Sequence, residues 1–225
     1  MAVFYGAALA NVVRGVPLGG DDSFFLPLWT NWQPGPHPGI LDWYTVLGGV
    51  MALAALAMHG ALYLALKTEG ELGRRANALA GKLWWAVAAL TVLSIPATVL
   101  ARPNSMGNYE QYPIAFLAPF GVLAALIVAF AAIRRRSEGT GFLASCGYLL
   151  CMMVGAVAGL FPVILPNVAP GGRDMTVARA LAGEHTLHVG VIWWSIGMAL
   201  ALFYAFVSYW LFRGKVSQDS ESYGH

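Results

Sequence analysis

The feature that most constrains the fold is a set of five long stretches without aspartate, glutamate, lysine or arginine. They span residues 44–66, 83–101, 113–133, 142–165 and 187–212. A helix rises about 1.5 Å per residue, so about 20 apolar residues cross the roughly 30 Å hydrocarbon core of a bilayer. Each stretch has about that length or more. The sequence therefore predicts an all-α integral membrane protein, a bundle of five full transmembrane helices.

The composition supports a bilayer as the solvent. Charged residues make up 11% of the 225 residues, against about 25% in soluble globular domains. The longest segment outside the apolar stretches, residues 17–43, is too short for a soluble domain. We therefore treat residues 1–225 as a single transmembrane domain. The formal net charge of +2 excludes the basic surface of a nucleic-acid-binding protein, and two cysteines, Cys146 and Cys151, make neither a disulfide framework nor a metal cluster.

The chain begins with a shorter apolar stretch. Residues 1–13 are too few to cross a bilayer, and they lack the basic start of a secretory signal peptide. We expect a partial helix over residues 1–16 that forms the last half of a transmembrane helix. On this interpretation the natural chain starts further upstream.

The positive charges indicate which helix ends face the cytoplasm, because cytoplasmic loops collect lysine and arginine. Nine of the 13 basic residues fall in segment 67–82, in segment 134–136 and in the tail after residue 212. The remaining four lie at the other ends of the spans and are Arg14, Arg102, Arg173 and Arg179. We expect the side with nine, and with it the C-terminus, to be cytoplasmic. Segment 67–82 also mixes both charge signs with good helix formers, which predicts a short amphipathic segment there.

One ionisable side chain lies well inside a predicted span. His59 is fifteen residues from Tyr44, which places it about 22 Å below the outer end of its helix. We interpret it as a neutral packing histidine, with proton handling or ligand binding as the alternative. His188 lies near the outer end of another span, about 20 Å from His59 in depth by helix rise alone. One haem iron cannot bind both.

Small residues and prolines indicate how the spans pack. Gly155 and Gly159 form a GxxxG pair, which allows close helix contact in lipid, where the hydrophobic effect does not drive helices together. Pro96, Pro119 and Pro162 each remove a backbone donor inside a predicted span, so we expect kinks there. The prolines after Phe161 and Leu165 are expected to close the fourth span.

Four stretches together resemble subunit II of the cytochrome bd quinol oxidases. They are GAALANVVRGVPL at 6–18, HGALYLALKTEGEL at 59–72, GLFPVILPN at 159–167 and YWLFRGKV at 209–216. Full members of that family begin with additional spans, including an acidic, tryptophan-bearing segment associated with a proton path. The resemblance therefore covers the C-terminal two-thirds of a normal subunit, and this chain looks N-terminally truncated by comparison.

The resemblance implies an accessory subunit of a quinol:oxygen oxidoreductase in a bacterial or archaeal cytoplasmic membrane. In this family subunit I carries two b-type haems, one d-type haem and the quinol oxidation site, and subunit II packs against it. A structural quinone or lipid in the grooves between helices is a further implication. The competing interpretation from the residues alone is a small polytopic transporter or permease, and a membrane-anchored enzyme is a third.

No matched position is a catalytic residue or a metal ligand of the family. Five polar residues in the matched stretches are instead expected to make structural contacts, because polarity in a membrane is costly. They are Asn11, Arg14, His59, Lys67 and Glu71. For each, an internal hydrogen bond or a side chain that extends to the membrane surface is the expected role.

Overall fold

The computed structural model describes residues 1–20, 23–211 and 214. Its longer helices are α1 (Ala2–Arg14), α2 (Trp43–Lys67), α3 (Gly70–Ala101), α5 (Leu117–Arg135), α6 (Glu138–Leu160) and α8 (Glu184–Leu211). Shorter helices are η1 (Pro103–Met106), α4 (Gly107–Gln111), η2 (Pro113–Phe116) and α7 (Val177–Ala180). Strands β1 (Val163–Leu165) and β2 (Met175–Thr176) pair antiparallel.

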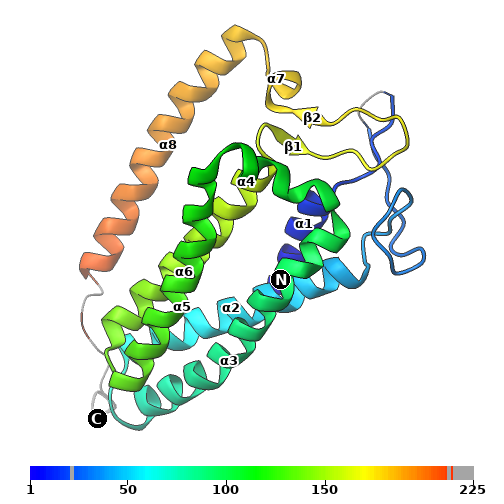
Figure 1. Ribbon diagram of the computed structural model, residues 1–225. Coiled ribbons are helices and arrows are strands. Elements are labelled where there is room, and N and C mark those ends of the chain that lie inside the picture. The colour runs from blue at the N-terminus through cyan, green and yellow to red at the C-terminus, as the bar shows by residue number, and fades with distance from the viewer. Residues whose placement is uncertain (21–22, 212–213, 215–225) are drawn as a thin grey trace.

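The helices α2, α3, α5 and α6 run side by side, and α1 packs against α2 (Figure 1). The α2–α3 and α5–α6 connections lie at one end of this bundle. The hairpin β1–β2 and the segment between α1 and α2 lie at the other end (Figure 1). The basic segments 67–82 and 134–136 are thus on the same side of the molecule, where the Asn77 side-chain amide donates to the carbonyl of Ile133 at 3.3 Å.

The prediction of five membrane-spanning helices is confirmed. Among the described residues, five helices or helical stretches are long and apolar enough to cross a bilayer, and α1 is a shorter apolar helix. They correspond to the five stretches predicted from the sequence. Two boundaries differ by five residues or more: α6, the fourth span, ends at Leu160 rather than at residue 165, and α3, the second span, begins at Gly70 rather than at residue 83.

The early start of α3 has a simple physical cause. Residues 70–82 form helix, as their composition predicts, but this helix continues without a break into the apolar stretch. The resulting 32-residue helix is roughly 48 Å long, which exceeds the bilayer core. Its polar first turns therefore extend beyond the hydrocarbon, and the residues predicted to form an amphipathic segment are helical from Gly70 and continuous with the span.

The three prolines have different consequences. Pro96 lies inside α3, which continues through it. Pro119 is the third residue of α5, where the backbone N–H has no partner within the helix, so it does not interrupt the span. Pro162 follows the end of α6 and precedes β1. The expectation that this proline closes the fourth span is confirmed.

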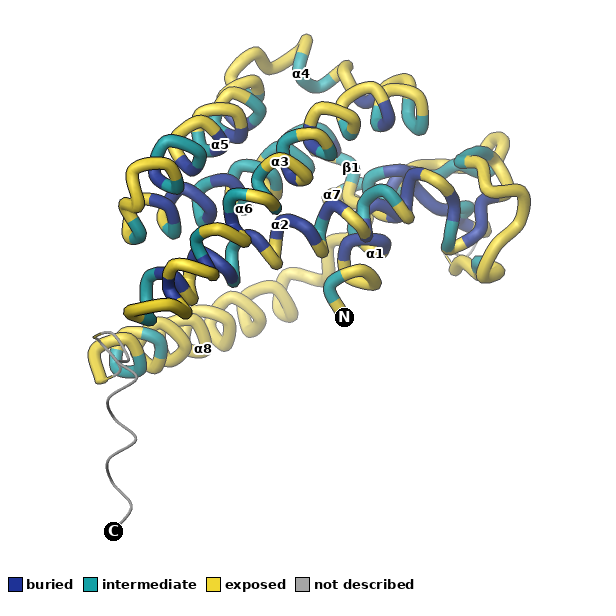
Figure 2. Tube along the Cα trace, turned by 90° about the horizontal axis from the view of Figure 1, so that it is seen from below, coloured by how far each residue is buried: buried dark blue, intermediate teal, exposed yellow. Residues whose placement is uncertain are grey.

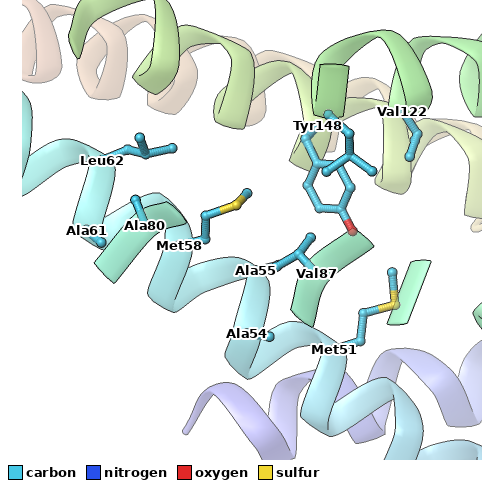
Figure 3. Packing of buried hydrophobic residues seen from close by; sticks show 11 residues of the cluster. Met51, Ala54, Ala55, Met58, Ala61, Leu62, Ala80, Val87, Val122 and Tyr148 are labelled. Carbon is cyan, nitrogen blue, oxygen red and sulfur yellow. The ribbon is translucent and has the colours of Figure 1, made fainter. Parts of the chain in front are cut away.

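The core of the bundle contains methionine, alanine and one tyrosine. Met51, Met58 and Val87 pack with Tyr148 at the meeting of α2, α3 and α6 (Figure 3). The Tyr148 hydroxyl lies 2.8 Å from the hydroxyl of Thr91, so the polar end of this buried ring is satisfied.

The closest helix contact is between α1 and α2. A Cβ on Gly6 would lie 2.5 Å from the carbonyl oxygen of Gly48 and 2.5 Å from the methyl of Ala52. Contact at this distance is possible only without a side chain, and it is the packing that small residues allow in membranes.

The helix α8 differs from the others. It stands apart from the bundle in both views (Figures 1 and 2) and is coloured as exposed along nearly its whole length (Figure 2). None of its described residues 184–211 is buried. Trp193 and Trp194 accordingly lie on an exposed surface of this chain.

Candidate functional site

A buried ion pair joins the end of α1 to the start of α2. The Arg14 guanidinium is 1% exposed and donates through Nη1 to Oδ2 of Asp42, which is equally buried. The same guanidinium donates to the carbonyl of Gly39 at 3.1 Å and to that of Gly15 at 3.3 Å. Its Nη2 donates to the side-chain oxygen of Asn11 at 2.6 Å. All three guanidinium nitrogens therefore have acceptors.

The polar groups of Asp42 have hydrogen-bond partners as well. Oδ1 of Asp42 accepts from the backbone N–H of Thr45 at 2.8 Å, and the Asp42 N–H donates to the Thr45 hydroxyl at 2.8 Å, which makes a capping box at the start of α2. The Asn11 amide donates to the carbonyl of Ile40 at 3.0 Å and to that of Ala7 at 2.9 Å.

We call Asn11, Arg14, Asp42 and Thr45 the polar clasp. A buried charge is tolerated only when it is paired and hydrogen-bonded, and the clasp meets this condition through side chains from α1 and α2 and carbonyls of the intervening loop. The role of the clasp is structural: it fixes residues 39–42, the end of the loop between α1 and α2, against α1.

A second loop joins the same end of the bundle. The backbone of Val16 donates to the carbonyl of Pro166 at 3.0 Å and accepts from the N–H of Val168 at 3.1 Å. The Asn167 side chain accepts from the N–H of Leu18 at 3.1 Å and donates to its carbonyl at 3.2 Å. Gly15 has φ 100°, and a Cβ there would lie 2.7 Å from the Pro166 carbonyl oxygen. The sequence stretches 6–18 and 159–167, far apart in the chain, are therefore in contact.

Asp174 extends this contact toward α3. Its carboxylate accepts from the backbone N–H of Asn167 at 2.7 Å. Burial lowers the pKa of the Arg102 guanidinium, and the charge of Asp174 opposes that shift. The Arg102 guanidinium remains charged at neutral pH, because an arginine stays protonated in proteins. The electrostatic attraction helps to hold the hairpin against the end of α3.

The structure places His59 in a separate polar contact. Its Nδ1 lies 2.8 Å from the Ser145 hydroxyl of α6, and its ring lies 5.0 Å from that of Phe142. The Tyr63 ring also lies against the Phe142 ring, with 5.5 Å between the ring centroids. The His59 side chain is half-buried. Its contact with Ser145 links α2 to α6 near the helix ends that lie beside the basic segments 67–82 and 134–136.

Lys67 and Glu71 lie at the α2–α3 connection. Lys67 is the last residue of α2, a favourable place for a cation because the helix dipole is negative there. Glu71 accepts from the Arg75 guanidinium at 3.0 Å and also from Arg74. These ion pairs are exposed and lie within one helix, so they do not join separate elements. The structure thus brings Asn11 and Arg14 together, and it leaves His59 and Glu71 in different places.

Sequence reasoning missed the cap at the end of α6. The Asn108 amide donates to the carbonyls of Ala158 and Gly159 at 3.2 Å each, and also to that of Phe161. The Tyr109 hydroxyl donates to the carbonyl of Gly155 at 2.7 Å. Helix ends leave carbonyls without partners, and Asn108 of α4 supplies a donor to those of Ala158 and Gly159. The Tyr109 hydroxyl bonds to a carbonyl inside the helix, about one turn before its last residues.

This cap gives the GxxxG pair a specific neighbour. A Cβ on Gly159 would lie 3.2 Å from the Tyr109 ring, and one on Gly155 would lie 3.5 Å from Ala118 of α5. Burial raises the pKa of Tyr109 above that of an exposed phenol, so the hydroxyl is a donor at neutral pH. The small residues thus admit an aromatic ring from a short connecting helix as well as a neighbouring helix.

Two other partners were also missed. Asp42 falls in the segment 17–43 outside the predicted spans, but its place directly before an apolar stretch, with threonine three residues later, is a signal for a helix cap. Ser145 is one of several small residues in its span, and no pattern marks it as the partner of His59.

His59 and His188 are not placed to bind one haem iron together. His59 is bonded to Ser145 in the half of α2 near its C-terminus. His188 is exposed in the second turn of α8 and lies 3.9 Å from Glu184, and α8 begins at the opposite end of the molecule (Figure 1). Within residues 1–20, 23–211 and 214, no group of three or more histidine, cysteine, aspartate or glutamate side chains is placed to hold a metal ion. His225 lies outside the described residues.

The chain is similar in sequence to known respiratory proteins. It is 27% identical over 218 residues to cytochrome bd ubiquinol oxidase subunit 2 of Bacillus subtilis (strain 168), a match that covers 94% of this chain and 59% of that protein. It is 24% identical to cytochrome bd-I ubiquinol oxidase subunit 2 of Escherichia coli (strain K12), over 95% of this chain and 62% of the relative. A probable cytochrome oxidase subunit 2 of Haemophilus influenzae is also 24% identical, over 97% and 63%.

The chain thus spans about three-fifths of the length of these relatives. The model of the family described as cytochrome bd terminal oxidase subunit II matches residues 1–212, which include the four stretches identified above except for the last residues of the fourth. The resemblance seen in the sequence is confirmed, and the chain belongs to the cytochrome bd terminal oxidase subunit II family.

Proposed function

We propose that this chain is an accessory membrane subunit of a cytochrome bd quinol:oxygen oxidoreductase and supports a haem-bearing subunit I in aerobic electron transport. The observation that carries the proposal is the family match over residues 1–212. The relatives are named as ubiquinol oxidase subunits. A transporter or permease, the alternative from composition alone, has no comparable support.

In this proposal the redox chemistry belongs to subunit I. The family resemblance assigns two b-type haems, one d-type haem and the quinol oxidation site to that subunit, and quinol reaches the complex from the membrane. The polar residues of the present chain fit a structural role, because Arg14, Asp42 and Asn11 are bonded to one another and His59 is bonded to Ser145.

The chain's contribution is a rigid support for subunit I. The clasp and the segment 159–167 fix one end of the bundle, and the close contact between α1 and α2 fixes their crossing. The helix α8 buries none of its described residues within this chain, so it offers apolar surface for subunit I, for lipid or for a structural quinone.

We also propose the orientation. The α2–α3 and α5–α6 connections, with their lysines and arginines, lie at one end of the bundle (Figure 1). Because cytoplasmic loops are enriched in these residues, this end faces the cytoplasm of a bacterial or archaeal cell. The last helix then ends on the cytoplasmic side, and the polar clasp lies on the outer side.

Affinity purification tests the proposal directly. A tag on this chain, expressed in its own host and extracted in mild detergent, should recover a coloured complex whose reduced-minus-oxidised spectrum shows b-type and d-type haem. The untagged strain is the control for haem proteins that bind the resin. A colourless homo-oligomer that becomes more stable on addition of a solute would refute the oxidase assignment and favour transport.

A further inference from the structure

The loop between α1 and α2 has an unusual surface. Residues 23–41, which we call the aromatic loop, contain no aspartate, glutamate, lysine or arginine. Phe25 is 87% exposed and Trp29 is 58% exposed, and Phe24, Leu28 and Trp32 are also exposed. Exposed apolar side chains gathered in one segment mark a surface that meets another apolar phase.

The aromatic loop is folded on itself. The backbone N–H of Ile40 donates to the carbonyl of Pro27 and that of Leu41 donates to Leu28, both at 2.8 Å. The Thr30 hydroxyl donates to the carbonyl of His37 at 2.9 Å. A Cβ on Gly39 would lie 2.5 Å from the Cα of Trp29. The two ends of the loop are therefore in contact, and the aromatic side chains stay outside this contact.

The polar clasp holds the aromatic loop at the end of the bundle. Asn11 donates to the Ile40 carbonyl and Arg14 donates to the Gly39 carbonyl. Because both side chains belong to α1, the loop has a fixed position relative to the helices that cross the membrane. The loop is already ordered when the chain folds, so contact with another apolar surface costs little further conformational entropy.

The exposed surface of the loop continues along α2. The backbone N–H of Trp43 donates to the carbonyl of Trp32 at 3.3 Å, which places the two residues next to each other. From Trp43 the exposed side chains Val46, Val50 and Leu53 follow at helical spacing on one face of α2. That face belongs to a membrane-spanning helix and is exposed in this chain.

We propose that the aromatic loop is an interfacial anchor, with Phe24, Phe25, Leu28, Trp29 and Trp32 in the headgroup layer of the membrane. Tryptophan favours this layer because its apolar ring carries a polar N–H, and phenylalanine and leucine enter the boundary between headgroups and acyl chains as the apolar face of interfacial segments. A lipid surface fits better than a soluble protein partner, because residues 23–41 carry no aspartate, glutamate, lysine or arginine to specify one and their surface is continuous with the exposed apolar face of the membrane-spanning helix α2. The leaflet is the outer one in the orientation proposed above, and the test below does not depend on that orientation.

Spin labels at single cysteines test the anchor in the assembled complex in bilayers of phosphatidylcholine and phosphatidylglycerol. Phe25→Cys and Leu28→Cys are made with Cys146→Ala and Cys151→Ala, and the same background without a new cysteine provides the spectrum to subtract. Gly35→Cys is the matched control, because it lies in the same loop and a Cβ there has nothing within 4 Å. Power saturation then compares collision with oxygen, which concentrates in lipid, and with a water-soluble nickel chelate.

We expect the ratio of oxygen to nickel accessibility at Phe25→Cys and Leu28→Cys to exceed that at Gly35→Cys severalfold. Ratios that are equally low at all three positions, with high accessibility to the nickel chelate, would show that the loop lies in water and would overturn the anchor. Low accessibility to both reagents at Phe25→Cys and Leu28→Cys would show burial against protein. It would overturn the lipid anchor and mean that a partner subunit covers the loop. Since the haem spectrum of the same preparation is recorded separately, a failure of the anchor is distinguished from a failure of the oxidase assignment.

Discussion

Neutralising Asp42 while keeping its shape tests whether the buried ion pair holds the end of the bundle together. In Asp42→Asn, the new amide can still accept from the Thr45 N–H and cap α2, because asparagine is a good cap residue. The guanidinium of Arg14, only 1% exposed, would remain charged without its carboxylate. Removing one partner of a buried pair costs about 3–5 kcal/mol, and we expect the lower end because neutral acceptors on Asn11, Gly15 and Gly39 remain.

The reciprocal change and the double variant complete a thermodynamic cycle. Arg14→Gln leaves the Asp42 carboxylate buried without its cation, and we expect it to lose about 3 kcal/mol as well. The double variant contains no buried charge, and its two amides can bond to each other. We therefore expect it to lose less stability than either single variant, which corresponds to a coupling energy of at least about 3 kcal/mol.

The assay is reversible unfolding of the full chain in mixed micelles, with helix content followed by circular dichroism as the denaturing detergent is increased. Glu71→Gln is the control, because it removes an ion pair that is 49% exposed at Glu71 and should change the midpoint little. A double variant whose loss equals the sum of the two single losses would refute the reasoning, because the charges would then not be coupled.

Three further changes test the helix contacts. Gly48→Ala should weaken the packing of α1 on α2, because the new Cβ would lie 2.7 Å from a methyl group of α1, whereas Gly60→Ala on the same helix meets nothing within 4 Å and should leave the thermal midpoint unchanged. Tyr109→Phe should cost about 1 kcal/mol for one hydrogen bond at neutral pH. Burial raises the pKa of Tyr109, so this phenol ionises at lower pH in the unfolded chain than in the folded one. The stability of the wild type should therefore fall above about pH 10, and unfolding midpoints measured over a pH series should fall less in the variant. His59→Ala should lower the yield of assembled complex more than turnover per haem, and a stable, haem-replete variant without activity would contradict the packing role.

Hydropathy was sufficient to locate the helices, because the length of an uncharged stretch must match the thickness of the bilayer. Hydropathy could not define the residue at which α3 begins. Residues 70–82 are polar enough to leave the hydrocarbon, yet nothing in them stops a helix, so the chain remains helical beyond the membrane. At the end of α6 the prolines did give the boundary, since Pro162 cannot continue the backbone hydrogen bonding.

The candidate polar residues were predictable by type but their partners were not. Arg14 and Asn11 stand out because a polar group near a membrane helix must be satisfied. Their partners lie 25 to 29 residues away in Gly39, Ile40 and Asp42, and no periodicity connects an irregular loop to a helix. The contact of segment 159–167 with Val16 and Leu18 was beyond sequence reasoning for the same reason, since Val16 and Leu18 take part only through backbone groups that every residue carries.

These contacts explain why one part of the molecule is closely packed while α8 is not. In lipid an apolar surface gains little from meeting another apolar surface, so helix packing depends on close approach at small residues and on polar groups that need partners. The helices α1 and α2 have both, in Gly6 against Gly48 and in Arg14 with Asp42. The described part of α8 is apolar and buries none of its residues, and its serine at 195 bonds within its own helix. Among the described residues, α8 has neither the close contact at glycine nor the buried ion pair that joins α1 to α2, and we propose that the surface of subunit I positions this helix in the complex.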